Sequence, residues 1–192
     1  MRSMPGVAKI HLPPQRSKLA ELAVGEQARL SGPVFTARDA THERLVAELE
    51  SKGALPYGLE GQVLFYAGPT PPVRGRAASA VGPTTARRMD AYTPTLLDAG
   101  IAATLGKGAR SRAVIDACVR AGSVYFAAVG GAAALLARHV RASEMIAYPE
   151  LGTEALVRLE LEDFPVYVAI DVHGHDLYAE APANWREERG DS

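Results

Sequence analysis

Residues 101–121 read IAATLGKGARSRAVIDACVRA, and they contain a complete strand, turn and helix. The apolar run over 101–105 predicts a buried strand, and Gly106-Lys107-Gly108 ends it. A helix is expected from about Arg110 to Ala121, with Cys118 at a buried position beside Ile115 and Val119. A strand that leads through a glycine-rich turn into a helix is the repeating unit of α/β proteins.

The same order of strand and helix occurs on both sides of this unit. Residues 27–35 predict a strand, and residues 37–51 predict a helix in which Leu45 and Leu49 share one face. Residues 124–129 predict another strand, and Gly130-Gly131 opens a short helix that ends near Arg138. This alternation favours helices packed on a sheet.

Sheet is also expected toward both ends of the chain. Further strands are predicted over residues 7–12, 62–66 and, weakly, 77–81, and Gly82-Pro83 leads into a helix over 86–99. Residues 155–161 and 166–171 are expected to pair with each other across Phe164-Pro165. The sequence therefore predicts one α/β domain with a mixed sheet over residues 1–182, followed by a charged tail over 183–192.

The composition excludes several classes of function. The formal net charge of −1 gives no general attraction to nucleic acid or to an anionic membrane, so any anion site must be a local group of cations. The single cysteine, Cys118, cannot by itself form an internal disulfide, a structural zinc site or an iron–sulfur cluster.

The chain is expected to be a cytoplasmic protein. Residues 1–14 lack the apolar stretch of a signal peptide. The longest uncharged run, residues 123–137, is shorter than the ~20 residues of a membrane-spanning helix and is interrupted by Gly130-Gly131.

Three predicted helix starts combine a hydroxyl group with a cation. They read TARD at 36–39, GPTTARR at 82–88 and GKGARS at 106–111. A helix N-terminus already carries partial positive charge and free N–H donors, so Arg38, Arg88 and Lys107 stand at locally unfavourable places. A bound anion would be stabilised by the cations and by the N–H groups together.

Simpler interpretations account for only part of this pattern. Thr36 with Asp39 fits a capping box, Thr85 fits an ordinary N-cap, and an exposed arginine is commonly just solvated. Phosphate is a poor candidate anion, because a Walker loop around Lys107 requires Gly at 101 and Ser or Thr at 108, where the chain has Ile101 and Gly108. Separate Arg and Lys anchors suit a dicarboxylate equally well.

These junctions also carry a family resemblance that extends from about residue 7 to about residue 180. The chain resembles the beta subunit, or C-terminal domain, of class I iron–sulfur fumarate hydratases and L(+)-tartrate dehydratases. The resemblance rests on TARDATH at 36–42, YAGP at 66–69, GPTT and RMD within 82–90, GKG at 106–108, EDFP at 162–165 and the turn over 171–176.

The resemblance implies a swivelling β/β/α domain and a partner alpha subunit, with an α2β2 assembly. The partner would hold a four-iron, four-sulfur cluster whose open iron acts as a Lewis acid on the leaving hydroxyl. In the family, the positions of Arg38, Arg88 and Lys107 bind the substrate carboxylates. Thr84 and Thr85 lie beside the reacting carbon, and Thr84 is the position proposed to move a proton.

The implied reaction is the reversible hydration of fumarate to malate, a hydro-lyase step of the tricarboxylic acid cycle. Proton removal beside a carboxylate builds negative charge on it, and fixed cations stabilise that charge. Tartrate dehydration is the alternative reaction, mesaconate is a further possible substrate, and a non-catalytic dicarboxylate-binding module is the alternative class. Arg87 and Ala109 depart from the family pattern, which leaves the substrate open.

Two groups of polar residues have weaker claims. His42 lies one helical turn after Arg38 and is expected to orient a carboxylate or Asp39, unless it is simply a packed or solvated histidine. The segment DVHGHD at 171–176 has the composition of a metal site, but Asp and Gly are ordinary in a turn, so we expect no metal there.

Overall fold

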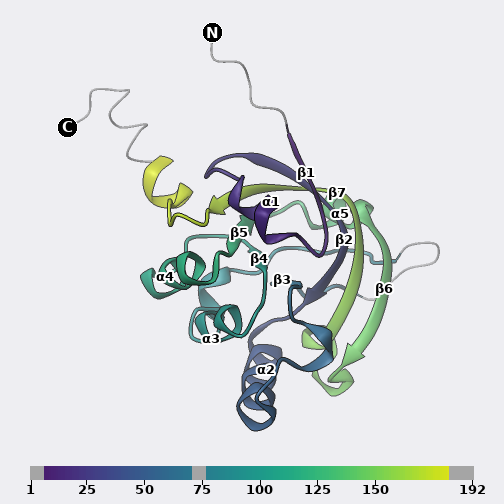
Figure 1. Ribbon diagram of the computed structural model, residues 1–192. Coiled ribbons are helices and arrows are strands. Elements are labelled where there is room, and N and C mark those ends of the chain that lie inside the picture. The colour runs from purple at the N-terminus through teal and green to yellow at the C-terminus, as the bar shows by residue number, and fades with distance from the viewer. Residues whose placement is uncertain (1–6, 71–76, 182–192) are drawn as a thin grey trace.

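The structure is a computed structural model that describes residues 7–70 and 77–181, and it contains one seven-stranded mixed sheet (Figure 1). The strand order is β1-β2-β3-β4-β5-β7-β6. The strands are β1 (Ala8–His11), β2 (Gln27–Thr36), β3 (Val63–Phe65), β4 (Ala103–Gly106), β5 (Val124–Ala127), β6 (Val140–Ala147) and β7 (Leu156–Ile170).

Strand pairing closes into a ring. At Phe35, β2 pairs in parallel with β3 and, along its opposite edge, in antiparallel fashion with β7. The parallel series continues from β3 through β4 to β5, and β5 pairs with the C-terminal end of β7. Strand β1 extends one edge of β2, and β6 pairs with the N-terminal half of β7.

Strands β3, β4 and β5 lie between two hydrophobic cores. Val63 and Phe65 of β3 pack into the core enclosed with β2 and β7, and the intervening Leu64 packs into the core beneath the helices. Tyr125 and Phe126 of β5 divide in the same way. Because both faces are buried, these strands are continuous apolar runs, which is why the sequence indicated them correctly.

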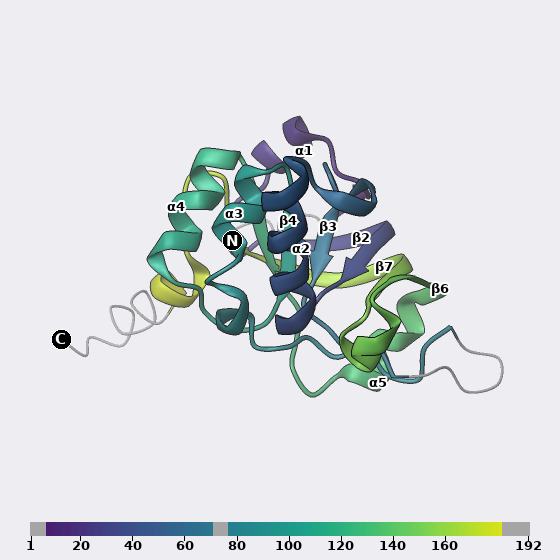
Figure 2. The ribbon, with the colours of Figure 1, turned by 90° about the horizontal axis from the view of Figure 1, so that it is seen from below.

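Three helices cover the second core. They are α2 (Asp39–Lys52), α3 (Thr93–Asp98) and α4 (Arg112–Ala121), and Figure 2 shows them side by side. The short helices α1 (Arg16–Ala20) and α5 (Ala133–Leu136) lie elsewhere in the domain. Within the described part of the chain, no helix has the length and apolar character needed to cross a bilayer.

The predicted helix over 86–99 is wrong as a single element. The structure has a 3-10 turn, η2 (Ala86–Met89), and then the separate helix α3. Pro94 explains the break, because inside a longer helix it would remove a hydrogen bond and clash with the preceding turn. In the structure it stands in the first turn of α3, where proline is favourable.

The predicted pair of strands near the C-terminus is also wrong, since β7 is one continuous strand. Pro165 lies between the part of β7 that pairs with β6, which ends at Leu161, and the part that pairs with β5, which begins at Tyr167. On this edge of β7 Pro165 faces a gap between two partners, where a proline is tolerated, while along the opposite edge it pairs with Arg29 of β2. The strand that Leu161 pairs with, β6, was missed because most of its side chains are exposed and its sequence lacks alternation.

Residues 77–81, predicted as a weak strand, form a loop. Val81 N–H donates to the Ala133 carbonyl, 3.1 Å away, and Thr70 N–H donates to the Ala80 carbonyl at 3.0 Å. These bonds satisfy the backbone outside the sheet. The predicted tail over 183–192 lies outside the described residues.

A buried guanidinium, that of Arg110, connects the segments below the helices. Its Nε donates to Asp90 Oδ1 at 2.7 Å, and its Nη2 donates to Thr93 Oγ1 at 2.7 Å. Its carbon Cζ lies 5.1 Å from the ring centre of Tyr66 and 4.9 Å from that of Tyr125. Burial opposes the charge, but Tyr66 and Asp90 raise the pKa of Arg110 overall, so this side chain stays charged.

We predict that Arg110→Met lowers the free energy of unfolding by about 3–5 kcal/mol, because it leaves the Asp90 carboxylate buried without its counter-ion. Arg112→Met is the matched control, since the Arg112 side chain is 82% exposed and its ion pair with Asp116 lies on the helix surface. Urea denaturation of both variants measures the difference. Equal small losses would show that the Arg110 network does not stabilise the fold.

Candidate functional site

An open pocket of about 430 Å³ lies where the parallel strands β2, β3 and β4 end. Because these strands are parallel, their carboxyl ends meet at one edge of the sheet, where α/β proteins bind ligands. The pocket is lined by Arg38, Gly68, Thr70, Ala80, Gly82, Pro83, Thr84, Thr85, Arg88, Lys107 and Ala133. All the predicted site residues except His42 therefore come together.

Backbone hydrogen bonds fix the threonine pair against Lys107. Thr84 N–H donates to the Tyr66 carbonyl at 2.6 Å, and Lys107 N–H donates to the Thr84 carbonyl at 3.2 Å. Thr85 and Lys107 form an isolated parallel bridge. A Cβ on Gly106 would lie 2.8 Å from Tyr66 Cδ2, so only glycine permits this close approach.

The start of α2 is capped by a side chain from elsewhere. Arg38 is the N-cap residue and makes no capping hydrogen bond, whereas Glu154 accepts the Ala40 N–H through Oε2 at 3.0 Å. Glu154 Oε1 also lies 3.3 Å from Arg38 Nη2. The capping-box interpretation of Thr36 is wrong, because its buried hydroxyl faces the Val157 carbonyl at 3.4 Å.

Carboxylates of the protein itself thus pair with some of the cations for which the sequence predicted a bound anion. Arg88 pairs with Asp39 through Nε–Oδ1 and Nη2–Oδ2 distances of 3.1 and 2.7 Å. Asp90 accepts the Ser111 N–H at 2.6 Å, beside the start of α4. Among the described residues, Lys107 has no acidic partner, so it brings an uncompensated positive charge to the pocket.

His42 is fully buried beneath this edge and does not line the pocket. Its Nδ1 lies 2.8 Å from the Arg38 carbonyl, which can only accept, so Nδ1 carries the proton. Burial lowers the pKa of His42 to about 4, and the imidazole is neutral at pH 7. The contact links His42 to the pocket through the backbone of Arg38.

Sequence reasoning missed Glu154, the partner of Arg38. Glu154 lies at the end of the 3-10 helix η4 (Pro149–Glu154), 114 residues beyond Ala40, and no local pattern marks it. Cys118 is buried in α4 as expected, and burial raises the pKa of its thiol to about 12. No group of acidic, histidine or cysteine side chains in the described ranges is placed to hold a metal ion.

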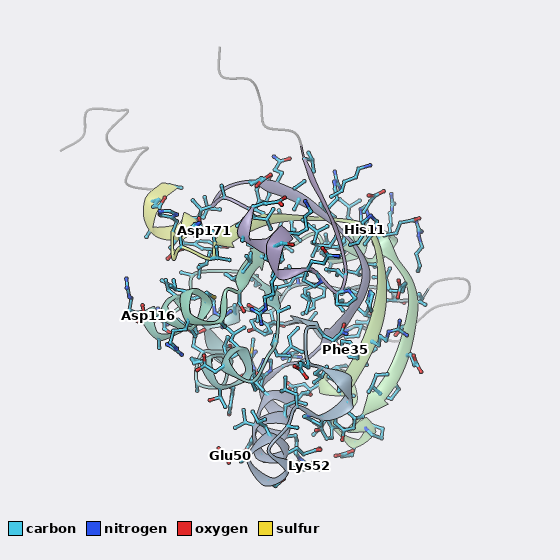
Figure 3. The ribbon with its side chains drawn as sticks, viewed as in Figure 1. His11, Phe35, Glu50, Lys52, Asp116 and Asp171 are labelled. Atoms are coloured by element: carbon cyan, nitrogen blue, oxygen red, sulfur yellow. The ribbon has the colours of Figure 1, made fainter. Side chains whose placement is uncertain are left out.

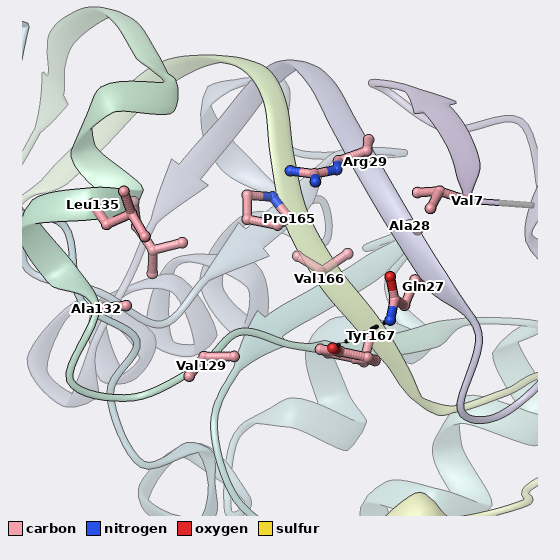
Figure 4. Close-up of a pocket in the computed structure, with 11 residues that line it drawn as sticks. Val7, Gln27, Ala28, Arg29, Val129, Ala132, Leu135, Pro165, Val166 and Tyr167 are labelled. Atoms are coloured by element: carbon pink, nitrogen blue, oxygen red, sulfur yellow. Dashed lines mark hydrogen bonds between the residues drawn. The ribbon is translucent and has the colours of Figure 1, made fainter.

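A second pocket, of about 300 Å³, has a different character (Figure 4). Leu135 lines one side of this pocket, and Val166 and Tyr167 of β7 line the other. Among the described residues that line it, Arg29 is the only charged one. This surface is mainly apolar. Of these two pockets, the one that contains Lys107 has the cations to bind an anion.

Comparison with known proteins places these residues in a family. The family model described as "Fumarase C-terminus" matches residues 3–181. Fumarate hydratase 2 of Leishmania major is 37% identical over 170 residues, which is 88% of this chain and 30% of that protein. The aerobic class I fumarate hydratase of Escherichia coli strain K12 is 37% identical over 164 residues, or 84% of this chain and 30% of that protein.

A shorter relative matches over nearly its whole length. The protein named "Putative L(+)-tartrate dehydratase subunit beta" of Methanocaldococcus jannaschii is 34% identical over 171 residues, which is 86% of this chain and 88% of that protein. The chain thus spans about three tenths of the fumarate hydratases quoted above but most of this subunit.

We predict that His42 makes the fold sensitive to acid. The unfolded chain binds a proton at His42 below about pH 6.5, whereas the folded chain does so only below about pH 4, so the free energy of unfolding falls as the pH is lowered through this window. His42→Asn keeps an N–H near the position of Nδ1 but does not titrate. Between about pH 7 and pH 4.5 the variant should lose roughly 2.5 kcal/mol less stability than the native chain in urea denaturation. Parallel losses would refute the buried neutral histidine.

Proposed function

This chain belongs to the fumarase C-terminal family, and we propose that it is the beta subunit of an iron–sulfur-dependent hydro-lyase that reversibly hydrates fumarate to malate. The observation that supports this most is the convergence of Arg38, Thr84, Arg88 and Lys107, from separate segments, on one pocket. The length of the subunit named in Methanocaldococcus jannaschii supports a separate alpha subunit, since this chain covers 88% of it. We further propose an α2β2 assembly in the cytoplasm and the swivelling β/β/α type of fold.

This chain's own residues do not fit an iron–sulfur cluster. Its single cysteine is buried in α4, and burial raises the pKa of that thiol to about 12, which disfavours the thiolate that iron binds. The cluster therefore belongs, in our proposal, to the alpha subunit. The contribution of this chain is to bind the substrate and to stabilise its charge.

The cations would hold the two carboxylates of the substrate. Arg38 and Arg88 are each paired on one side, with Glu154 and Asp39, and these pairs fix the direction in which their other N–H donors point. Lys107 adds a mobile charge without an acidic partner among the described residues. A dicarboxylate would thus meet two guanidinium groups held in direction, those of Arg38 and Arg88, and the more flexible ammonium group of Lys107.

The reaction requires removal of a proton next to a carboxylate. Negative charge then accumulates on that carboxylate, and the pocket cations would stabilise it. The Thr84 backbone N–H donates to the Tyr66 carbonyl, which holds the residue at the pocket, and the Thr84 hydroxyl would hold or relay the proton. A threonine hydroxyl is a weak base, so the cations beside it, or a second group, must favour its deprotonated form. Thr85 lies beside it, and His42 would act indirectly through Arg38.

Tartrate dehydration is the alternative reaction, and the name of the Methanocaldococcus jannaschii relative favours it. Fumarate and tartrate chemistry differ by hydroxyl groups, so one or two contacts decide between them, and some of these contacts come from the partner. A dicarboxylate-binding module without catalysis is a separate possibility. It predicts tight binding by this chain alone.

We predict that Arg88→Ala and Lys107→Met each lower turnover of the assembled enzyme by roughly 100-fold or more, because both remove charge that stabilises the transition state. Arg87→Ala is the matched control, since Arg87 is exposed and does not line the pocket. Steady-state kinetics with fumarate and thermal unfolding curves test this. Near-normal turnover in either pocket variant would overturn the assignment of these anchors.

We predict that the purified chain is colourless and does not hydrate fumarate. Anaerobic affinity purification from its native cells should yield a brown complex that has this activity. An iron–sulfur absorption band from the chain alone would contradict the proposal. A folded chain that binds dicarboxylates tightly and retains no partner would identify the non-catalytic module instead.

A further inference from the structure

The turn that carries Lys107 is held from two directions at the next residue. The Gly108 N–H donates to the Tyr178 hydroxyl at 3.0 Å, and the Gly108 carbonyl accepts from the Tyr125 hydroxyl at 3.0 Å. Gly108 has a φ of +84°, a left-handed conformation that glycine adopts without strain, and a Cβ there would meet nothing within 4 Å. The glycine has no side chain to hold this peptide by packing, and the two tyrosine hydroxyls hold it through its N–H and its carbonyl.

The two tyrosines come from very different places. Tyr125 lies on β5 and is fully buried, whereas Tyr178 is 38% exposed and belongs to a short helical turn over residues 177–181. Tyr125 is thus held in place by the core, independently of the C-terminal turn. Tyr178 can hold Gly108 only if the C-terminal turn is itself rigid.

Hydrogen bonds to the buried Asp171 carboxylate hold that turn together. Asp171, which Figure 3 labels where β7 leads into the turn, accepts the N–H groups of His173 and His175 at 2.9 and 3.1 Å and the His175 ring Nδ1 at 2.8 Å. Although burial opposes its charge, His175 and these backbone groups lower the pKa of Asp171, so the carboxylate is ionised at neutral pH.

The last part of the turn is capped reciprocally. The Tyr178 N–H donates to Asp176 Oδ1 at 2.9 Å, and the Asp176 N–H donates to Glu180 Oε1 at 3.1 Å. This reciprocal arrangement resembles a capping box, although it uses the second and fourth residues after Asp176 and not the third. It holds the backbone of Tyr178, whose hydroxyl accepts from the Gly108 N–H.

We propose that Tyr178 is a positioning residue, and that the C-terminal turn over residues 171–181 orders the Lys107 turn for substrate binding. The role in substrate binding rests on the proposed function, whereas the ordering of the turn does not. The turn that resembled a metal site is then a structural support for a pocket residue. Lys107 needs such support because, among the described residues, no acidic partner fixes its side chain and only its backbone is held, by Thr84 and Ala86.

The proposal predicts a specific kinetic signature. Without the Tyr178 hydroxyl the charge of Lys107 remains, but its turn is more mobile in the free enzyme and must be ordered when substrate binds. The cost of ordering appears in ground-state and transition-state binding alike. KM should therefore rise roughly fivefold, the value of one neutral hydrogen bond, while kcat changes little.

Tyr178→Phe removes the hydroxyl and keeps the ring. Tyr167→Phe is a matched control, because Tyr167 is also 38% exposed and its hydroxyl accepts from Gln27 at 3.4 Å, whereas the Gly108 N–H donates to Tyr178. Hydrogen–deuterium exchange of backbone amides, measured by NMR on the full chain, comes first. We expect the Gly108 amide to exchange at least roughly fivefold faster in Tyr178→Phe and at the native rate in Tyr167→Phe.

The kinetic measurement then uses the assembled enzyme with both variants. Unchanged exchange at Gly108 in Tyr178→Phe would overturn the ordering of the turn. Faster exchange with native KM, or an equal rise of KM in Tyr167→Phe, would overturn its role in substrate binding. An inactive native assembly would refute the proposed function instead, and the exchange result would still decide whether the turn is ordered by Tyr178.

Discussion

The buried ion pair between Arg110 and Asp90 lies under the pocket and is the contact on which its geometry depends. Asp90 follows η2, which carries Arg88, and Arg110 follows the turn that carries Lys107. The guanidinium also donates to Thr93 and packs on Tyr66, whose carbonyl holds Thr84. A buried ion pair is a poor source of net stability, since desolvation offsets most of the attraction. Its effect here is to add a side-chain contact to the backbone hydrogen bonds that already join the segment of Thr84 and Ala86 to Lys107.

Ion pairs also determine how the cations of the pocket are held. Cations gathered at a sheet edge repel one another, and the chain reduces this repulsion with its own carboxylates. Glu154 neutralises Arg38 and caps α2 at the same time, and Asp39 neutralises Arg88. The paired arginines keep donors free and fixed in direction, so a ligand carboxylate would meet an ordered surface. Lys107 is ordered differently, through its backbone and the glycine that follows it.

Much of this could be read from the sequence, and the failures have physical causes. The apolar runs over residues 62–66 and 101–105 indicated buried strands, and the cations after parallel strands had to gather at one edge. Pro94 was overlooked, and it divides the predicted helix. The continuity of β7 through Pro165 and the capping by Glu154 depend on contacts between segments far apart in the chain. His42 carried no local sign of burial, because its burial comes from packing against Tyr66 on another element.

The composition of the pocket supports the proposal that this chain contributes one part of an active site. Among the described residues that line it, the side chains are those of Arg, Lys, Thr, Pro, Ala and Gly. Every polar one of them stabilises negative charge or carries a hydroxyl, and neither an imidazole nor a carboxylate faces the cavity as a base of ordinary strength. Such a surface can bind a dicarboxylate and stabilise the carbanion character of a transition state. It supplies nothing to remove the leaving hydroxyl. In the proposed hydration, taking a proton and expelling a hydroxyl need groups from outside this pocket, and this supports the proposed partner subunit.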